Sequence, residues 1–145
     1  MNEARNAGVP VAIATTTTLG NVEALLRAAL GPGAKGRFAA IGAGDDVAAK
    51  KPAPDVYELV VRRLSVPAAR CVAIEDTVNG VQAARSAGLQ VVVTRSLYGG
   101  SDGFEGALAV VDHLGDSGTP CTVIAGPPIA SDMVVLADLA RWIGG

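Results

Sequence analysis

The sequence predicts an α/β protein with three layers, in which helices cover both faces of a Rossmann-like, mostly parallel sheet. Short apolar runs that suit buried strands alternate along the chain with segments whose apolar residues recur at helical spacing. Half of the 145 residues are hydrophobic but only 3% are aromatic, so we expect a core of aliphatic side chains. The 18 glycines fit the many tight turns of such a fold.

The composition argues against several classes of partner. The formal net charge is −2 and the sequence has no basic patch, so we expect no nucleic-acid partner. No apolar run approaches the length of a membrane span, and the first residues are polar, so we expect no membrane association and a cytoplasmic location. Cys71 and Cys121 each open an apolar run and are expected to be buried free thiols.

The first predicted elements are a short helix over residues 3–7 and a strand over residues 9–14. A helix this short is marginal by itself, so we expect Met1 to lie inside an element that begins upstream. Four threonines follow the strand, and one of the later ones is expected to cap the next helix. Thr15 stands where the strand ends, so its hydroxyl is expected at the ligand-binding edge of the sheet.

A lysine in the next loop is the second residue of interest. A short strand over residues 38–41 leads into a loop over residues 42–53, in which Lys51 precedes Pro52. The proline keeps Lys51 extended, so its side chain can reach across the sheet edge toward an anion. The alternative is an ordinary solvated lysine, since most charged side chains lie on the surface. A helix is predicted from Pro54 onward.

The stretch over residues 72–88 is the most informative part of the chain. A short apolar strand ends at two acids, Glu75 and Asp76, and a helical pattern follows until Gly88. Two adjacent carboxylates repel each other unless a cation compensates them, which favours a divalent metal at the carboxyl edge of the sheet. The alternative is that Asp76 or Thr77 only caps the helix and that Glu75 is solvated.

The rest of the chain continues the alternation of strands and helices. His113 is a lone histidine, and no second histidine or cysteine is placed to form a metal site with it. The predicted elements are strands over residues 89–93, 107–111 and 122–125, a polar loop over residues 97–106, and a last helix over residues 133–143 anchored by Trp142.

Three polar features therefore fall at successive strand ends or strand-exit loops. They are the hydroxyl of Thr15, the ammonium of Lys51, and the carboxylate pair of Glu75 and Asp76. Phosphoryl chemistry needs this set, because the hydroxyl and the ammonium bind phosphate oxygens while the acids hold Mg²⁺. Each feature alone is weak evidence, but the ordered trio on an alternating scaffold indicates a phosphoryl-transfer site.

The sequence resembles the haloacid dehalogenase superfamily, and within it the β-phosphoglucomutase/CbbY-like group of sugar-phosphate phosphatases. Three stretches carry the resemblance, namely VAIATTTT, KKPAPDVY and VAIEDTVNGVQAARSAG. The resemblance implies a hydrolase that cleaves a small sugar phosphate through an aspartyl-phosphate. It implies that Thr15 and Thr16 bind the phosphoryl group and that Lys51 stabilises the intermediate. It also implies that Glu75 and Asp76 bind the Mg²⁺ cofactor.

One motif of that family is missing from the sequence. The family carries its nucleophile in an Asp-x-Asp segment, and no two aspartates of this chain are separated by one residue. The helical cap domain of the group is absent as well. We therefore expect residues 1–145 to form a partial core domain without the strand of the first motif, and to be inactive alone.

A missing central strand has a structural consequence. In the family that strand lies between the strands predicted here over residues 9–14 and 72–74, so each should lack a neighbour on one side. Exposed strand edges favour pairing with a second chain, so we expect self-association. The alternative function is a non-catalytic phosphate- or Mg²⁺-binding module, or a subunit that completes its site with another chain. A phosphoryl-receiver domain is disfavoured, because here the threonine and the lysine precede the acids.

Overall fold

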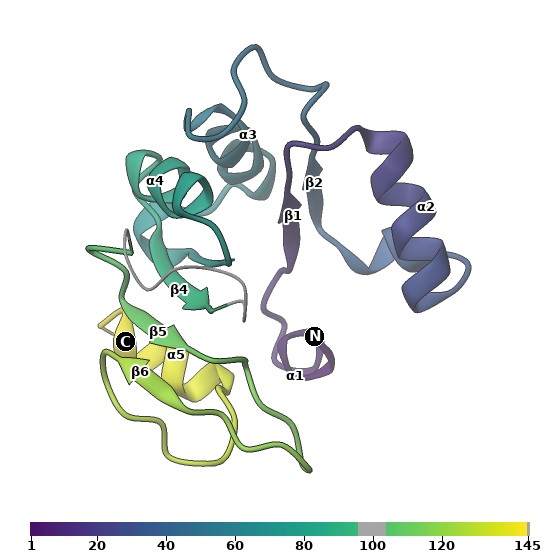
Figure 1. Ribbon diagram of the computed structural model, residues 1–145. Helices are drawn as coiled ribbons and strands as arrows, with labels where there is room; N and C mark the ends of the chain where they lie inside the picture. Colours follow the sequence, from purple (N-terminus) through teal and green to yellow (C-terminus); the bar gives the residue numbers. More distant parts are fainter. Residues whose placement is uncertain (96–103, 145) are drawn as a thin grey trace.

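The computed structural model describes residues 1–95 and 104–144, in which helices and strands alternate as far as residue 94 (Figure 1). The α-helices are α1 (Asn2–Asn6), α2 (Leu19–Leu30), α3 (Asp55–Leu64), α4 (Val78–Ser86) and α5 (Leu136–Trp142), and two 3₁₀ turns are η1 (Ala34–Arg37) and η2 (Ala68–Arg70). The strands are β1 (Ala12–Ala14), β2 (Ala40–Gly42), β3 (Val72–Glu75), β4 (Gln90–Thr94), β5 (Ala109–Val111) and β6 (Val123–Ala125). The polar loop predicted over residues 97–106 lies mostly outside the described residues.

The strands form two separate sheets. β1 pairs with β2 in parallel, and a second sheet has the order β3-β4-β5-β6, in which only the β5–β6 pair is antiparallel. Parallel neighbours require crossover connections, and α2 supplies the one from β1 to β2 while α4 supplies the one from β3 to β4. The predicted α/β class with a mostly parallel sheet is confirmed.

β1 and β3 each have one edge without a strand partner among the described residues. Within the described residues, β1 has β2 as its one strand partner, and β3 has β4 as its one partner. The predicted missing neighbour of β1 is therefore confirmed. α3 packs on β1 and β2 and also touches α4, so a helix rather than a strand connects the two sheets (Figure 1).

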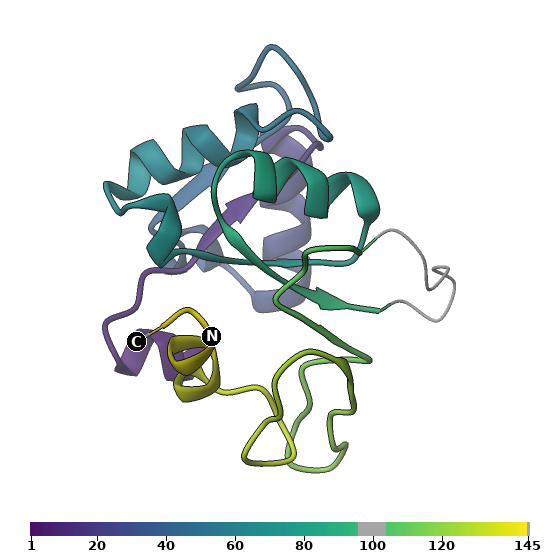
Figure 2. The same ribbon diagram turned by 90° about the vertical axis from the view of Figure 1, so that its left-hand side faces the viewer.

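The core has two parts on opposite faces of the larger sheet. Val91 and Val93 of β4 face a cluster that includes residues of α3 and α4, whereas Val92 faces a second cluster with Trp142 of α5. Successive residues of a strand point to opposite faces, so β4 is covered on both sides. Figure 2 shows α3 and α4 on one side of the strands, and α5 with α1 on the other. The predicted anchoring role of Trp142 is confirmed, since it is 9% exposed.

Two threonines cap helices, one in the threonine run where a cap is predicted and one, Thr77, that the alternative interpretation of the acidic stretch names. The Thr18 side chain accepts a hydrogen bond from the Asn21 backbone N–H at 3.4 Å at the start of α2. The Thr77 hydroxyl accepts from the Gly80 N–H at 3.1 Å at the start of α4. Each cap satisfies a backbone donor that has no partner inside its helix, so both helix starts are defined by local sequence.

Some predicted boundaries and burials are wrong. β1 begins at Ala12 rather than at residue 9, because Pro10 has no N–H to donate to a sheet. α5 begins at Leu136 rather than at residue 133, because preceding backbone groups bond to neighbouring segments instead of forming a helical turn. Cys71 and Cys121 are free but only half-buried, and burial raises the pKa of both thiols. Among residues 1–95 and 104–144, no helix has the length and apolarity to cross a bilayer.

Candidate functional site

Lys51 and Glu75 form an ion pair at the carboxyl end of β3. Lys51 lies in the loop before α3, and Glu75 is the last residue of β3. The Lys51 Nζ donates to Glu75 Oε1, and the side chains are only 12% and 6% exposed. Lys51 is therefore not the solvated lysine of the alternative interpretation. The structure brings together the ammonium and one carboxylate of the predicted site.

The Lys51 ammonium also contacts the end of β1. Its Nζ donates to the Ala14 carbonyl at 3.1 Å and lies 3.4 Å from the Tyr57 hydroxyl oxygen, which can accept from it. A lysine ammonium carries three donors, so together with Glu75 each donor has an acceptor. Ala14 is the last residue of β1, so Lys51 connects the carboxyl ends of β1 and β3.

Tyr57 is a site residue that sequence reasoning missed. It lies in the first turn of α3, is 6% exposed, and donates its hydroxyl proton to Glu75 Oε1. Burial and the neighbouring Glu75 carboxylate raise the pKa of Tyr57 far above its ordinary value, so the hydroxyl remains a donor at neutral pH. The feature of the sequence that could have indicated this role is the position of a tyrosine, whose hydroxyl can form hydrogen bonds, in the helix that follows Lys51.

The second oxygen of Glu75 faces the first turn of α4. Thr77 Oγ1 donates to Glu75 Oε2 at 3.5 Å, and the positive end of a helix favours a negative charge nearby. A Cβ added to Gly80 would lie 1.8 Å from Oε2, so only glycine leaves room for the carboxylate in this position. Glu75 is therefore held on one side by Lys51 and Tyr57 and on the other by the start of α4.

Thr15 and Thr16 lie at the same end of the sheet as Lys51. Thr15 follows Ala14, and its hydroxyl accepts from the Thr17 N–H at 3.3 Å. Thr16 has an exposed side chain, and its backbone carbonyl closely approaches Gly44, where a Cβ would lie 2.0 Å from that oxygen. No hydrogen bond joins either threonine to Lys51 in the described part of the chain. The structure thus places Thr15 next to the end of β1 that Lys51 contacts, without a hydrogen bond between the two side chains.

Asp76 is the one acid of the pair that stays open to solvent. It is exposed and forms no hydrogen bond or ion pair with another described residue. Residues 1–95 and 104–144 contain no group of three or more metal-ligating side chains. Magnesium often binds through only one or two carboxylates, with waters and substrate phosphate as the other ligands, so the exposed Asp76 carboxylate fits such an ion, whereas the Glu75 oxygens have Lys51, Tyr57 and Thr77 as partners.

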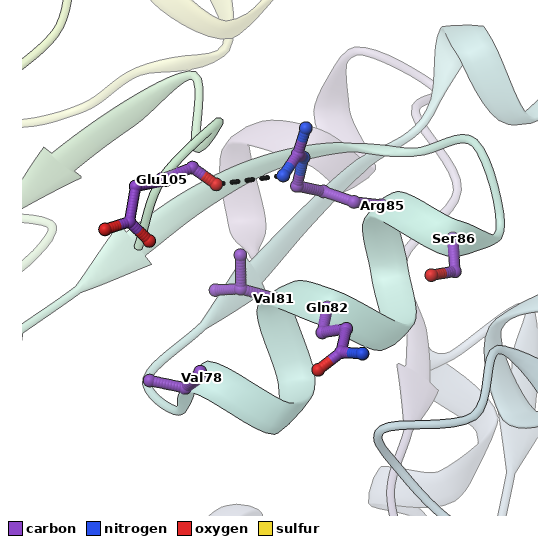
Figure 3. A pocket seen from close by; sticks show the side chains of 6 residues that line it. All are labelled: Val78, Val81, Gln82, Arg85, Ser86 and Glu105. Carbon is purple, nitrogen blue, oxygen red and sulfur yellow. Dashed lines mark hydrogen bonds between the residues drawn. The ribbon is translucent and has the colours of Figure 1, made fainter. Parts of the chain in front are cut away.

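Two hollows on the surface lie away from this cluster. One, of about 520 Å³, lies over α4, where Arg85 Nη1 donates to the Glu105 carbonyl at 2.9 Å (Figure 3). The other, of about 440 Å³, lies near α1 and the start of β1. Neither hollow is lined by Thr15, Lys51 or Glu75. The residues around the hollow of Figure 3 are Val78, Val81, Gln82, Arg85, Ser86 and Glu105.

Residues 1–88 match the haloacid dehalogenase-like hydrolase family, and the chain belongs to this family. It is 50% identical over 143 residues to the protein CbbY encoded on a plasmid of Cupriavidus necator. The alignment covers 99% of this chain and 56% of that protein. It is 40% identical over 88 residues to the fructose-1-phosphate phosphatase YqaB of Escherichia coli, covering 61% of this chain and 45% of that protein.

A solved structure extends the similarity to the fold. A mutant of CbbY from Rhodobacter sphaeroides, crystallised with xylulose-(1,5)bisphosphate, superposes with a TM-score of 0.73 at 49% identity. The match covers 77% of this chain and 50% of that one. The chain thus spans about half the length of each of these three relatives. The predicted resemblance to the superfamily and to its CbbY-like group is confirmed.

Proposed function

We propose that this chain supplies the phosphate- and metal-binding part of a Mg²⁺-dependent phosphatase that acts on a small sugar phosphate. The observation that carries the proposal is the buried contact of Lys51 with Glu75 and with the end of β1. It fixes a cation and an acid at the sheet edge where ligands of parallel α/β sheets bind. Residues 1–145 are proposed to be one partial core domain without a cap domain.

Each predicted site residue has a role in this proposal. Thr15 and Thr16 bind phosphate oxygens with hydroxyl and backbone groups, and Lys51 offsets the negative charge that develops on the phosphoryl group. Asp76, with Glu75 beside it, holds the Mg²⁺ ion. When bound, that ion would neutralise charge on the phosphoryl oxygens. The CbbY complex with a sugar bisphosphate supports the substrate class.

The 145-residue chain alone is expected to be inactive, because it contains no Asp-x-Asp segment to supply the nucleophile. We expect turnover when the chain is joined behind the N-terminal part of the Cupriavidus necator relative that it does not cover. The assay measures phosphate release from xylulose-1,5-bisphosphate with Mg²⁺ or with a chelator. Turnover only in the fusion and only with Mg²⁺ supports the proposal.

Two variants of the fusion sharpen this test. Asp76→Asn removes the open carboxylate and is expected to lower kcat at least about a hundredfold, a loss typical of a group that stabilises transition-state charge. Asp132→Asn changes another exposed aspartate outside the proposed ligand set and should leave kcat within about twofold, as expected for a surface substitution. Equal activity of both variants, or robust turnover by the 145-residue chain itself, contradicts the assignment.

A second candidate function is supported by the edges of β1 and β3 that have no strand partner in the described part of the chain. Strand edges without a partner are templates for pairing with another chain. A subunit that completes its site with another polypeptide would use these edges, and its acid pair and lysine would then serve a site shared between two chains.

The open edges predict self-association of the isolated chain. Sedimentation velocity at increasing concentration is expected to show dimers or larger species at micromolar protein. Ala12→Pro removes a donor from β1, and proline is tolerated on edge strands, so this variant should associate less. A sample that remains monomeric throughout, with Ala12→Pro indistinguishable from it, would argue against an accessible edge.

A further inference from the structure

Tyr57 is buried within the cluster of Lys51 and Glu75, yet none of the roles proposed above uses it. Its hydroxyl donates to Glu75 Oε1 and lies 3.4 Å from Lys51 Nζ, which can donate to it. Its ring lies 4.7 Å from the same nitrogen, measured to the ring centroid, which is within the range of a cation–π contact. Tyr57 therefore contacts both members of the ion pair at once.

The hydroxyl supplies a constraint that the ion pair lacks. A lysine ammonium ends a flexible chain and can rotate to other acceptors, so a single contact with a carboxylate does not fix its position. Tyr57 extends from α3, an element that packs on both β1 and β2. Its donation to Glu75 Oε1 ties the carboxylate to α3, and that carboxylate in turn holds Lys51 beside the Ala14 carbonyl.

We propose that Tyr57 is a positioning residue, whose hydroxyl fixes Glu75 and thereby holds the Lys51 ammonium at the sheet edge. Its importance for phosphoryl transfer rests on the proposed function, but its effect on Lys51 does not. The role belongs to the hydroxyl rather than to the ring. It requires that Lys51 become mobile and accessible when the hydroxyl alone is removed.

The test measures the acetylation rate of each lysine by mass spectrometry. The chain has three lysines, Lys35, Lys50 and Lys51, of which the first two are exposed. Tyr57→Phe keeps the ring and removes the hydroxyl, whereas Tyr57→Leu removes both. A hydrogen bond to a charged group is strong enough that its loss is expected to raise the Lys51 rate about tenfold in Tyr57→Phe. The rates of Lys35 and Lys50 should not change.

Two further measurements distinguish a loss of Lys51 positioning in Tyr57→Phe from a general destabilisation of the fold. Hydrogen exchange of the buried β4 segment in Tyr57→Phe should match that of the unmodified chain, and the ¹⁵N-ammonium signal of Lys51 should be lost. An unchanged Lys51 rate in Tyr57→Phe with a raised rate in Tyr57→Leu would show that only the ring matters and would overturn the proposal. A parallel rise in β4 exchange would overturn it as well.

Kinetics of the fusion enzyme test the link to catalysis separately. Tyr57→Phe is expected to lower kcat at least tenfold with little change in KM, because a displaced lysine affects the transition state more than ground-state binding. If the unmodified fusion shows no turnover, the proposed function fails while the labelling result still decides the role of Tyr57. If the fusion is active and Tyr57→Phe leaves kcat unchanged, the link between the position of Lys51 and catalysis is excluded, and the labelling result decides the positioning role.

Discussion

Lys51→Met is expected to lower the free energy of unfolding by about 3–5 kcal/mol, because it leaves the buried Glu75 carboxylate without its cation. The Glu75 side chain is only 6% exposed, so water cannot replace the lost partner without rearrangement. The Ala14 carbonyl at the end of β1 also loses its donor. Urea denaturation at pH 7 measures the change, with far-UV circular dichroism and tryptophan fluorescence tested for coincidence.

A mutant cycle separates the ion pair from the packing of the two side chains. Glu75→Ala alone should also be strongly destabilising, whereas Lys51→Met/Glu75→Ala removes both charges and should be more stable than the sum of the single effects predicts. Lys35→Met breaks the pair with Glu23, whose members are 55% and 42% exposed, and should cost less than about 1 kcal/mol. Similar losses for Lys51→Met and Lys35→Met would show that burial does not strengthen the Lys51 pair.

The sequence was sufficient to predict the order of elements and the edge at which the polar residues gather. The run that ends at Glu75 is apolar and the pattern after it is helical, so both the strand and its carboxyl end follow from local periodicity. A cap from one of the later threonines after β1 was expected, and Thr77 was one of the two caps named in the alternative interpretation of the acidic pair, because such side chains act on backbone groups within the same turn. Such signals lie within a few residues and need no knowledge of tertiary contacts.

The contacts within the cluster could not be predicted in the same way. Lys51 and Glu75 are separated by 24 residues, and Tyr57 and Glu75 by 18, so their meeting depends on how α3 packs beside β3. The sequence led us to expect that a metal ion compensates the charges of both acids. In the structure, Glu75 instead pairs with Lys51 and accepts a hydrogen bond from Tyr57, while Asp76 is exposed. A glutamate can pair with a metal ion or with a lysine ammonium, so the residue type in the sequence does not distinguish these two partners.

Gly80→Ala is expected to destabilise the protein by about 1–3 kcal/mol, the range typical of overpacking in a close-packed site. The added Cβ would lie 1.8 Å from Glu75 Oε2 and 2.1 Å from Cδ, so the carboxylate must move. A carboxylate without partners could move away at little cost in free energy, but the Glu75 carboxylate is held by Lys51 and Tyr57. Moving it weakens the ion pair as well.

Gly20→Ala is the matched control for this substitution. Gly20 also lies in the first turn of a helix, α2, and no atom lies within 4 Å of the position its Cβ would take. Alanine is the better helix former, so Gly20→Ala should raise the free energy of unfolding by up to about 1 kcal/mol. Two glycine-to-alanine changes of the same kind are therefore expected to have opposite signs, measured by the same urea titration.

The double variant Lys51→Met/Glu75→Ala removes the atoms that the Gly80 Cβ would meet. In that background Gly80→Ala should become neutral or stabilising, because the helix propensity of alanine remains and the clash is gone. A reversal of sign would show that the cost of Gly80→Ala comes from displacing Glu75. An unchanged loss in both backgrounds would instead place the strain in the backbone of α4 and refute the steric link between Gly80 and Glu75.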